Sequence, residues 1–304
     1  MTELILQKGA RIPWRELYAL CKPKVVYLIV FTAIVGMLLA SPGMVPLDIL
    51  FFGTLGIGLG AASGAAINHW VDQRIDAIME RTQDRPLPRG QLTSAQALTF
   101  ALSLGVISML LLGLFVNLLT ALLTLVSLVG YAVIYTMFLK RSTPHNIVLG
   151  GAAGAAPPIL GWTAVTGEVN TEALLLFLVI FIWTPPHFWA LAIRRRKEYA
   201  KAGVPMLPVT HGVEFTKLNI LLYTLMLVAV TLLPFVIQMS GLLYLSGALA
   251  LGIGFVWHAW RLYSTDGDEH SMKTFGYSIF YLSALFVFLL ADHYLREVIR
   301  AFFM

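Results

Sequence analysis

Three polar residues recur at intervals of four near the end of a long apolar stretch: Asn68, Asp72 and Asp76. On a helix, positions four apart lie on one face, each about one turn above the last. An amide oxygen and two carboxylates in this arrangement suit a hard divalent cation such as Mg²⁺. Ionisable groups at the mouth of an apolar helix also need a functional reason to be there. The spacing therefore predicts a metal site formed by Asn68, Asp72 and Asp76.

Basic residues accompany this motif. Arg81 and Arg85 follow it directly, and Lys140 and Arg141 come at the end of another apolar stretch. Such cations bind phosphate oxygens and stabilise the charge that develops on a departing diphosphate, which would ionise an allylic C–O bond. The alternative is a solvated helix end held by salt bridges, because acidic residues continue the spacing. The predicted catalytic residues are Asn68, Asp72, Asp76, Arg81, Arg85, Lys140 and Arg141.

An allylic cation also needs a dry cavity with aromatic walls. Six aromatic residues are candidates for cation–π contact, although a single aromatic residue in such a chain is more often a packing residue. Residues 150–158, which read Gly-Gly-Ala-Ala-Gly-Ala-Ala-Pro-Pro, predict a helix kinked at its proline pair. Such a helix either only packs closely against its neighbours or borders a wide cavity. The candidate aromatic residues are Tyr131, Tyr135, Trp162, Trp183, Phe188 and Trp189.

The elements that hold these residues are predicted to be membrane helices. The mean hydropathy is +0.80, 58% of the 304 residues are hydrophobic and 12% are charged. A spanning helix needs roughly 20 apolar residues, and a β-barrel would show alternation instead. The sequence therefore predicts one all-α, polytopic membrane domain over residues 1–304. Its expected helices lie near 25–41, 47–67, 94–113, 115–138, 146–165, 173–192, 217–238, 242–260 and 275–294.

The basic residues predict the orientation. Of the 21 Lys and Arg, 19 lie in the N-terminal segment, which includes Lys8 and Arg11, or in alternate loops on the same side. Only Arg296 and Arg300 lie on the other side. The positive-inside rule then places the N-terminus in the cytoplasm and the C-terminus outside. The two long loops near 68–93 and 193–216 lie on the cytoplasmic side.

Other classes of protein are disfavoured. The net charge of +5 follows from the loop asymmetry and gives no basic, aromatic face that would indicate nucleic-acid binding. The single Cys21 excludes an internal disulfide and a cysteine-based metal cluster. No signal peptide is expected in the first 23 residues. A transporter would place polar groups near the middle of the membrane, whereas here they lie at the cytoplasmic ends of the helices.

The first motif resembles the aspartate-rich motif of the UbiA-type intramembrane prenyltransferases. Further phrases resemble the haem O-forming branch of that family. They include Cys21-Lys22-Pro23-Lys24, Asn146-Ile147-Val148, Pro186-His187-Phe188-Trp189, Glu198-Tyr199 and Pro205-Met206-Leu207-Pro208. The resemblance covers residues 20–215 in detail. It implies nine helices around a central cavity, with cytoplasmic loops 68–93 and 193–216 capping a magnesium–diphosphate site.

The resemblance also implies an activity. The farnesyl group of farnesyl diphosphate would be transferred to a vinyl group of haem B, giving haem O and diphosphate with Mg²⁺ as cofactor. The expected partners, besides the two substrates, are the lipid bilayer and a haem A synthase or a terminal oxidase assembly. No nucleic-acid partner is expected. A bacterial inner membrane is the expected location, with a mitochondrial inner membrane as the alternative.

The sequence departs from the wider family after the sixth predicted helix. Most members have a second aspartate-rich motif there, but this chain has only Glu198 beside several basic residues. That site would bind fewer metal ions, or its arginines would pair with haem propionates. His187 would contact haem iron, accept a proton or bond a loop carbonyl. The predicted substrate-binding residues are Tyr131, Tyr135, Asn146, Trp162, His187, Arg194, Arg195, Lys197, Glu198 and Tyr199.

Three alternatives remain at this point. The first is a UbiA-type prenyltransferase that acts on a quinone precursor or a chlorin. The second, from another class, is a multi-pass transporter. The third is a scaffold subunit of oxidase assembly, which would keep its function when Asp72 is replaced by Asn.

Overall fold

The computed structural model describes residues 13–303, with side chains described as far as Arg296. Every regular element in this range is a helix, and η1 is a π-helix. The elements are α1 (Trp14–Leu20), α2 (Pro23–Leu39), α3 (Leu47–Asp76), α4 (Ser94–Phe115), α5 (Leu118–Val129), η1 (Gly130–Leu139), α6 (Lys140–Ser142), α7 (Asn146–Ala155), α8 (Pro157–Thr166), α9 (Thr171–Arg194), α10 (Arg196–Lys201), α11 (Leu207–Thr210), α12 (Val213–Val236), α13 (Leu242–Ser264) and α14 (Ser271–Phe303).

The described residues contain eight helical segments long and apolar enough to cross a membrane, and a bent pair, α1 and α2, that can form a ninth. The pair bends by 55° at Lys22, which has the left-handed conformation with φ 49°. The chain between 146 and 166 is one span divided between α7 and α8, because Pro157 and Pro158 cannot continue the hydrogen bonding of α7. The prediction of an all-α, polytopic membrane protein with about nine spans is confirmed.

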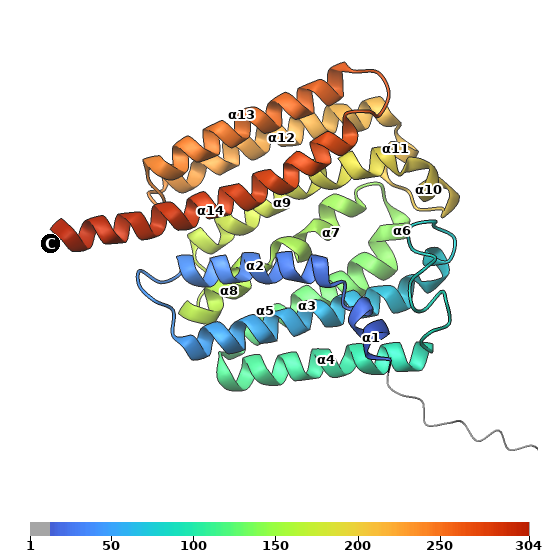
Figure 1. The fold of residues 1–304 in the computed structure, drawn as a ribbon, viewed down its shortest axis with the longest axis horizontal. Coiled ribbons are helices and arrows are strands. Elements are labelled where there is room, and N and C mark those ends of the chain that lie inside the picture. Colours follow the sequence, from blue (N-terminus) through green and yellow to red (C-terminus); the bar gives the residue numbers. More distant parts are fainter. Residues whose placement is uncertain (1–12, 304) are drawn as a thin grey trace, which may run out of the picture.

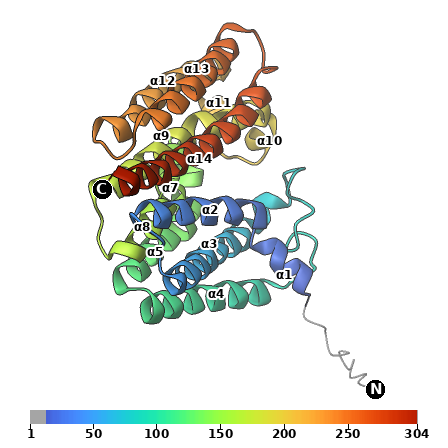
Figure 2. The same cartoon turned by 60° about the vertical axis from the view of Figure 1, so that its left-hand side comes forward.

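The helices stack in layers (Figures 1 and 2). Helices α12 and α13 lie on one side of the bundle, α3 and α4 on the other, and α2, α9 and α14 between them. The backbones of α2 and α8 approach most closely at two glycines: a Cβ at Gly36 would overlap the backbone of Pro158, and one at Gly161 would overlap that of Ala33. This contact clamps the C-terminal half of α2 against α8.

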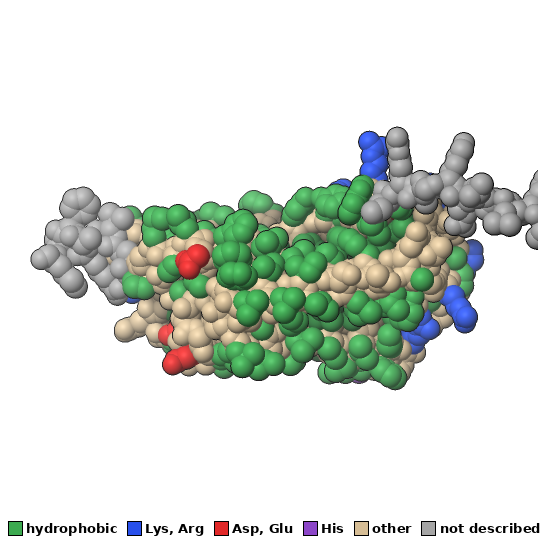
Figure 3. Space-filling view, turned by 90° about the horizontal axis from the view of Figure 1, so that it is seen from below, with side chains coloured by type: hydrophobic (Ala, Val, Ile, Leu, Met, Phe, Trp, Pro, Cys, Tyr) green, Lys and Arg blue, Asp and Glu red, His purple; other side chains and the backbone are tan. Residues whose placement is uncertain are grey.

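The surface is that of a membrane protein. Apolar side chains cover most of the face in Figure 3, while Lys and Arg gather toward one end and acidic side chains toward the other. The basic end carries α1 and the connections after α3 and α9 (Figure 1). This distribution agrees with the predicted orientation, which stays a prediction. Lys8 and Arg11, on which it partly rests, lie outside the described residues.

Two predicted loop boundaries differ from the structure. Helix α3 continues to Asp76, so its connection to α4 begins at residue 77 and not near 68. The segment after α9 contains the two short helices α10 and α11. Tyr199, Met206 and Leu207 of this segment are buried together with Trp189 and Ile193 of α9. The segment therefore packs as a cap on the end of α9. Its helices are too short to be stable alone, and the burial of these apolar side chains holds them in place.

Candidate active site

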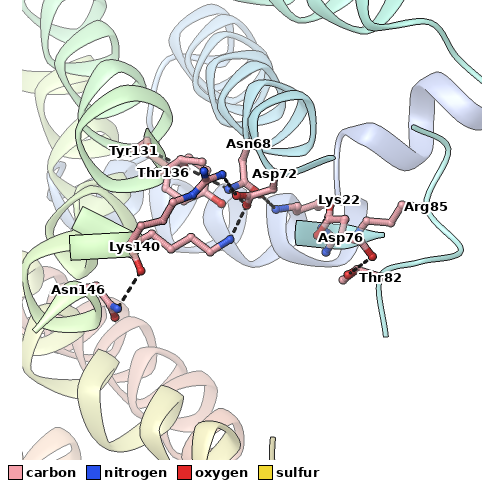
Figure 4. A network of polar contacts seen from close by, with 11 residues as sticks. Lys22, Asn68, Asp72, Asp76, Thr82, Arg85, Tyr131, Thr136, Lys140 and Asn146 are labelled. Atoms are coloured by element: carbon pink, nitrogen blue, oxygen red, sulfur yellow. Dashed lines mark hydrogen bonds and ion pairs between the residues drawn. The ribbon is translucent and has the colours of Figure 1, made fainter. Parts of the chain in front are cut away.

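The predicted metal motif lies on the last turns of α3. Asn68, Asp72 and Asp76 are all buried, with at most 4% of each residue exposed. Figure 4 shows the three side chains on one face of the helix, turned toward Lys22, Lys140 and Arg85. The period of four along a continuous helix therefore brings the predicted residues together, although they lie 46 and 68 residues from two of the cations they meet.

The amide of Asn68 has a defined orientation. Its Nδ2 donates to Asp72 Oδ2 at 2.9 Å and to Thr136 Oγ1 at 3.1 Å. Thr136 Oγ1 donates its only hydrogen to the Tyr131 carbonyl at 2.8 Å, so it can only accept from Asn68. The Asn68 Oδ1 atom is thereby left as the acceptor, and Lys22 Nζ donates to it. Both residues belong to the π-helix η1, in which residues five apart come close together, and Thr136 Oγ1 thereby reaches the Tyr131 carbonyl.

Cations from separate segments meet the carboxylates. Lys140 Nζ lies 2.5 Å from Asp72 Oδ2, and Arg85 lies 2.7 Å from Asp76 Oδ2. Arg141 is 3.8 Å from Asp72 Oδ1. Together with Lys22, these cations outnumber the two carboxylates. Such an excess of positive charge suits a multiply anionic ligand better than a bare metal ion.

The oxygen donors nevertheless fit a metal. Asp72 Oδ1 is buried and has no hydrogen-bond partner among the described residues. The Asn68 amide nitrogen makes the two donor bonds given above, so its Oδ1 atom is the one that can accept or coordinate. No three His, Cys, Asp or Glu side chains gather at a metal-binding distance in the described part of the chain. The candidate donor set is therefore two carboxylates and one amide oxygen. This number suits Mg²⁺, which keeps several waters and takes further oxygens from a phosphorylated substrate.

An apolar cavity begins beside the motif. It has a volume of about 160 Å³ and is lined at its polar end by Lys22 and Tyr131. Gly60 and Gly64 of α3 and Gly154 of α7 border it. At Gly60 an added Cβ would come within 2.8 Å of the Thr124 methyl group, so a larger residue would narrow the cavity. Both interpretations of the small-residue helix apply to part of it: Gly150 and Gly151 pack against Tyr135 and Thr184, whereas Gly154 borders the cavity.

Tyr131 and Tyr135 stand next to each other at the motif. Their rings are stacked with centroids 5.7 Å apart, and the Tyr135 ring fills the space above Gly150. Asn146 is fully buried and donates to the Lys140 carbonyl at 3.3 Å. Asn146 thus supports the segment that carries Lys140. Of the other predicted catalytic residues, Arg81 is exposed.

The segment after α9 divides the remaining predicted residues. Tyr199 is buried, and burial raises the pKa of its phenol, while the positive charges of Arg81 and Arg85 oppose this rise. Arg195 pairs with Glu198 at 2.6 Å. Arg194 lies 3.6 Å from Asp268 in the connection between α13 and α14, and Lys197 is exposed.

Arg196, which was not among the predicted residues, holds the same Asp268 at 2.8 Å. This hydrogen bond lowers the pKa of the Asp268 carboxyl group. Arg194 and Arg196 therefore tie two connections together.

Two predicted residues lie away from the motif. Trp162 lines a pocket with Glu172 and His293, near the first turn of α9 and so at the opposite end of the bundle from Arg194. His187 lies on the C-terminal half of α9 and faces a groove with Phe275. Its aromatic side chain and the family resemblance suggested Trp162 as a site residue, and only the fold shows at which end of the bundle it lies.

Lys22 and Thr136 belong to the site but were not predicted as site residues. Lys22 has a weak signature in the sequence, since it precedes a proline at the start of an apolar helix. Thr136 has none, because a threonine in an apolar stretch is common and its partner Asn68 is 68 residues away.

Known proteins resemble the chain in sequence and in fold. The UbiA prenyltransferase family matches residues 29–287. The protoheme IX farnesyltransferase of Thioalkalivibrio sulfidiphilus is 65% identical over 97% of this chain and 98% of its own length. That of Legionella pneumophila is 61% identical over 94% of this chain and 98% of its own.

Solved structures share the fold. A digeranylgeranylglyceryl phosphate synthase superposes with a TM-score of 0.79 at 18% identity, covering 92% of this chain and 98% of that one. A UbiA homologue from Archaeoglobus fulgidus bound to DMAPP and Mg²⁺ gives a TM-score of 0.65 at 16% identity, covering 90% and 99%. At this identity the likeness concerns the fold alone. The family match and the two close sequence relatives show that the chain belongs to the UbiA prenyltransferase family and, within it, to the protoheme IX farnesyltransferases.

Proposed function

We propose that the protein transfers the farnesyl group of farnesyl diphosphate to a vinyl group of haem B and releases diphosphate. The observation that carries this proposal is the cluster of Asn68, Asp72 and Asp76 among Lys22, Lys140 and Arg85 at the mouth of an apolar cavity. The charged cluster suits the diphosphate, and the cavity suits the isoprenoid chain. The names of the sequence relatives support haem B as the acceptor.

The bond changes are those of an allylic substitution followed by hydration. The C1–O bond of farnesyl diphosphate breaks and its electron pair leaves with the diphosphate. The outer carbon of the vinyl group forms the new bond to C1, and the inner carbon becomes cationic. Water adds its oxygen there and loses a proton, which gives the hydroxyethylfarnesyl group of haem O. The overall balance is farnesyl diphosphate, haem B and water to haem O and diphosphate.

The residues of the motif bind and orient the leaving group. Asp72, Asp76 and the Asn68 oxygen would hold Mg²⁺, which when bound supplies Lewis-acid stabilisation of the leaving diphosphate. Lys22, Lys140 and Arg85 can donate hydrogen bonds to the diphosphate oxygens. Arg81 and Arg141, exposed at the same mouth, add positive charge. The pairs that these cations make with the carboxylates keep them at the site.

The cavity protects the reactive carbon. Tyr131 lies at its polar end, where the π face of its ring can stabilise an allylic cation. The apolar walls exclude water until the vinyl group has reacted. Tyr135, stacked on Tyr131, holds that ring in place.

The segment after α9 is a second proposed substrate-binding region. Arg195, Glu198 and the buried Tyr199 lie together there, and Arg194 and Lys197 are exposed beside them. With a single acid, this region suits an anionic group of a substrate better than a second metal ion. We also propose that the protein lies in the cytoplasmic membrane of a bacterium, as one domain with its N-terminus inside. The bacterial origin of the sequence relatives supports the location, and the basic residues in alternate loops support the orientation.

A direct assay tests the proposal. Purified protein in detergent receives haem B, farnesyl diphosphate and Mg²⁺, and reversed-phase chromatography follows the pigment. We expect a later-eluting haem that is absent without metal and absent with Asp72→Asn. Diphosphate release only with a quinone precursor would show that the acceptor is a quinone precursor and not haem B. No reaction with any acceptor would return the transporter and scaffold interpretations.

A further inference from the structure

A second hollow in the bundle lies outside the cluster and the cavity described above. It is a groove of about 620 Å³ between α2 and α14, within the ~300–1,000 Å³ typical of small-molecule sites. Leu28 and Phe31 of α2 form one wall and Ile279 and Val287 of α14 the other, and His187 of α9 lies between them. The groove is open to the outside of the bundle, so an apolar ligand can enter it from the lipid.

Helix α2 separates the groove from the apolar cavity. One of its faces lines the cavity through Val25, Val26 and Ile29. The other lines the groove through Lys24, Tyr27, Leu28 and Phe31. Both hollows reach the first turn of α2, with Lys22 at the end of the cavity and Lys24 at the end of the groove. Ligands in the two hollows therefore come closest to each other at this turn.

The hydrogen bonds around His187 determine its tautomer. Its Nδ1 lies 2.7 Å from Ser278 Oγ. That hydroxyl already donates its only hydrogen to the Phe275 carbonyl at 2.6 Å, so it must accept from His187. Nδ1 therefore carries the proton of the neutral ring, and Nε2 carries the free lone pair. A histidine whose Nδ1–H is bound in this way is arranged to ligate a metal through Nε2.

The imidazole is also held rigidly. It lies between the rings of Trp183 and Phe275, stacked on both with centroid distances of 4.2 and 4.6 Å. Trp183 Nε1 donates to the Ser278 carbonyl at 2.8 Å, which fixes the residue that orients His187. Both ring nitrogens of His69 are fully buried without a hydrogen-bond partner, but Nε2 of His187 does not belong to this group of atoms in the described residues. His187 thus presents one free nitrogen to the groove.

We infer that this groove is the haem B site and that His187 Nε2 is an axial ligand of the haem iron. The inference rests on the proposed function and adds the place and the ligand. The apolar walls cover the porphyrin faces. Lys24, at the polar end and without an acidic partner in the described part of the chain, pairs with a propionate. A lipid tail would also fill an apolar groove, but it gives no reason for an oriented imidazole within the membrane.

The first test is haem binding without the prenyl donor. The full-length protein in nanodiscs is titrated with haem B, and the Soret band and the electron paramagnetic resonance spectrum are recorded. We expect a histidine-ligated haem in the wild type, its loss in His187→Ala with at least 10-fold weaker binding, and no change in His258→Ala, an intramembrane control outside the groove. Added imidazole should restore the spectrum of His187→Ala. An unchanged spectrum and affinity in His187→Ala would overturn the inference.

Two further variants test it without removing the ligand. Ser278→Ala leaves the imidazole in place but removes its orienting partner, and it should weaken haem binding by about 10-fold, the lower end of the effect of such partners. Lys24→Gln should weaken binding of haem B but not of its dimethyl ester, whose propionates carry no charge. Equal loss for both would contradict the pairing of Lys24 with a propionate.

The two proposals fail separately. If the wild type farnesylates haem B but His187→Ala binds haem unchanged, the groove assignment is wrong and the activity stands. If His187 ligates haem but no farnesylated haem forms, the site stands and the proposed reaction is wrong.

Discussion

The hydroxyl of Thr136 has a larger expected effect than its distance from the substrate suggests. Thr136 turns the Asn68 oxygen toward the cation position by accepting from the Asn68 amide. Thr136→Val removes that acceptor, and we expect the Mg²⁺ concentration for half-maximal activity to rise about 10-fold. Binding of Mn²⁺ with diphosphate, followed by electron paramagnetic resonance, should weaken equally. Thr136→Ser should restore both.

A double-mutant cycle separates orientation from structure. In Asn68→Asp both side-chain oxygens are equivalent, so Thr136→Val should cause little further loss in that background. If Thr136→Val lowers activity by the same factor with and without Asn68→Asp, the hydroxyl does not act through Asn68.

The two lysines at the start of α2 make a matched pair. Lys22 faces the cavity and bonds Asn68, while Lys24 faces the groove. Lys22→Gln should lower the farnesyl transfer rate by about 100-fold, as the loss of one electrostatic donor does, without changing haem affinity. Lys24→Gln should weaken haem B binding and leave the KM for farnesyl diphosphate unchanged. Steady-state kinetics and haem titration measure both, and identical profiles would show that the two faces of α2 are not separate.

The sequence predicted those site residues that share one helix. Asn68, Asp72 and Asp76 follow from a period of four, which is a local property. Lys22 and Thr136 reach them from segments 46 and 68 residues away, and no local pattern records such a contact. The placement of Trp162 at the far end shows the same limit, since chemistry suggested a role that position does not support.

At the scale of elements, the close contact of α2 with α8 has a measurable consequence. A Cβ at Gly161 would overlap the Ala33 backbone, whereas one at Gly113 in α4 would meet nothing within 4 Å. Gly161→Ala should therefore destabilise the protein by about 2 kcal/mol, as overpacking does. Thermal unfolding in detergent measures this, with Gly113→Ala as the control. Equal melting temperatures for the two variants would show that α2 and α8 can separate at little cost.

The spans were predictable and their irregularities were not. Runs of roughly 20 apolar residues identify membrane helices directly, and the proline pair located the break before α8. The π-helix η1 and the short helices α10 and α11 depend on tertiary packing. These irregular elements also carry Tyr131, Thr136 and Tyr199: residue type and family resemblance suggested the two tyrosines, but nothing in the sequence indicated the backbone geometry that positions them or the role of Thr136.

At the scale of the whole molecule, the orientation can be tested with single cysteines. The chain has only Cys21, so Cys21→Ser gives a cysteine-free background. Gly43, between α2 and α3, and Gln91, between α3 and α4, are both exposed and lie at opposite ends of α3. We expect an impermeant maleimide to label Gly43→Cys in cells with a permeabilised outer membrane. It should label Gln91→Cys only after the inner membrane is opened, and the reverse pattern would invert the topology.

The clamp between α2 and α8 also determines how the first turn of α2 can move. The C-terminal half of the helix is fixed at Gly36, while Lys22 lies 14 residues away, about 21 Å at 1.5 Å per residue. A tilt of only about 5° about the clamp would shift the Lys22 end by about 2 Å. The helix is then a lever with its pivot near its C-terminal end. A ligand on either face would change the lever position that the other ligand meets, so the affinities for the two substrates should be coupled by the same factor in both directions.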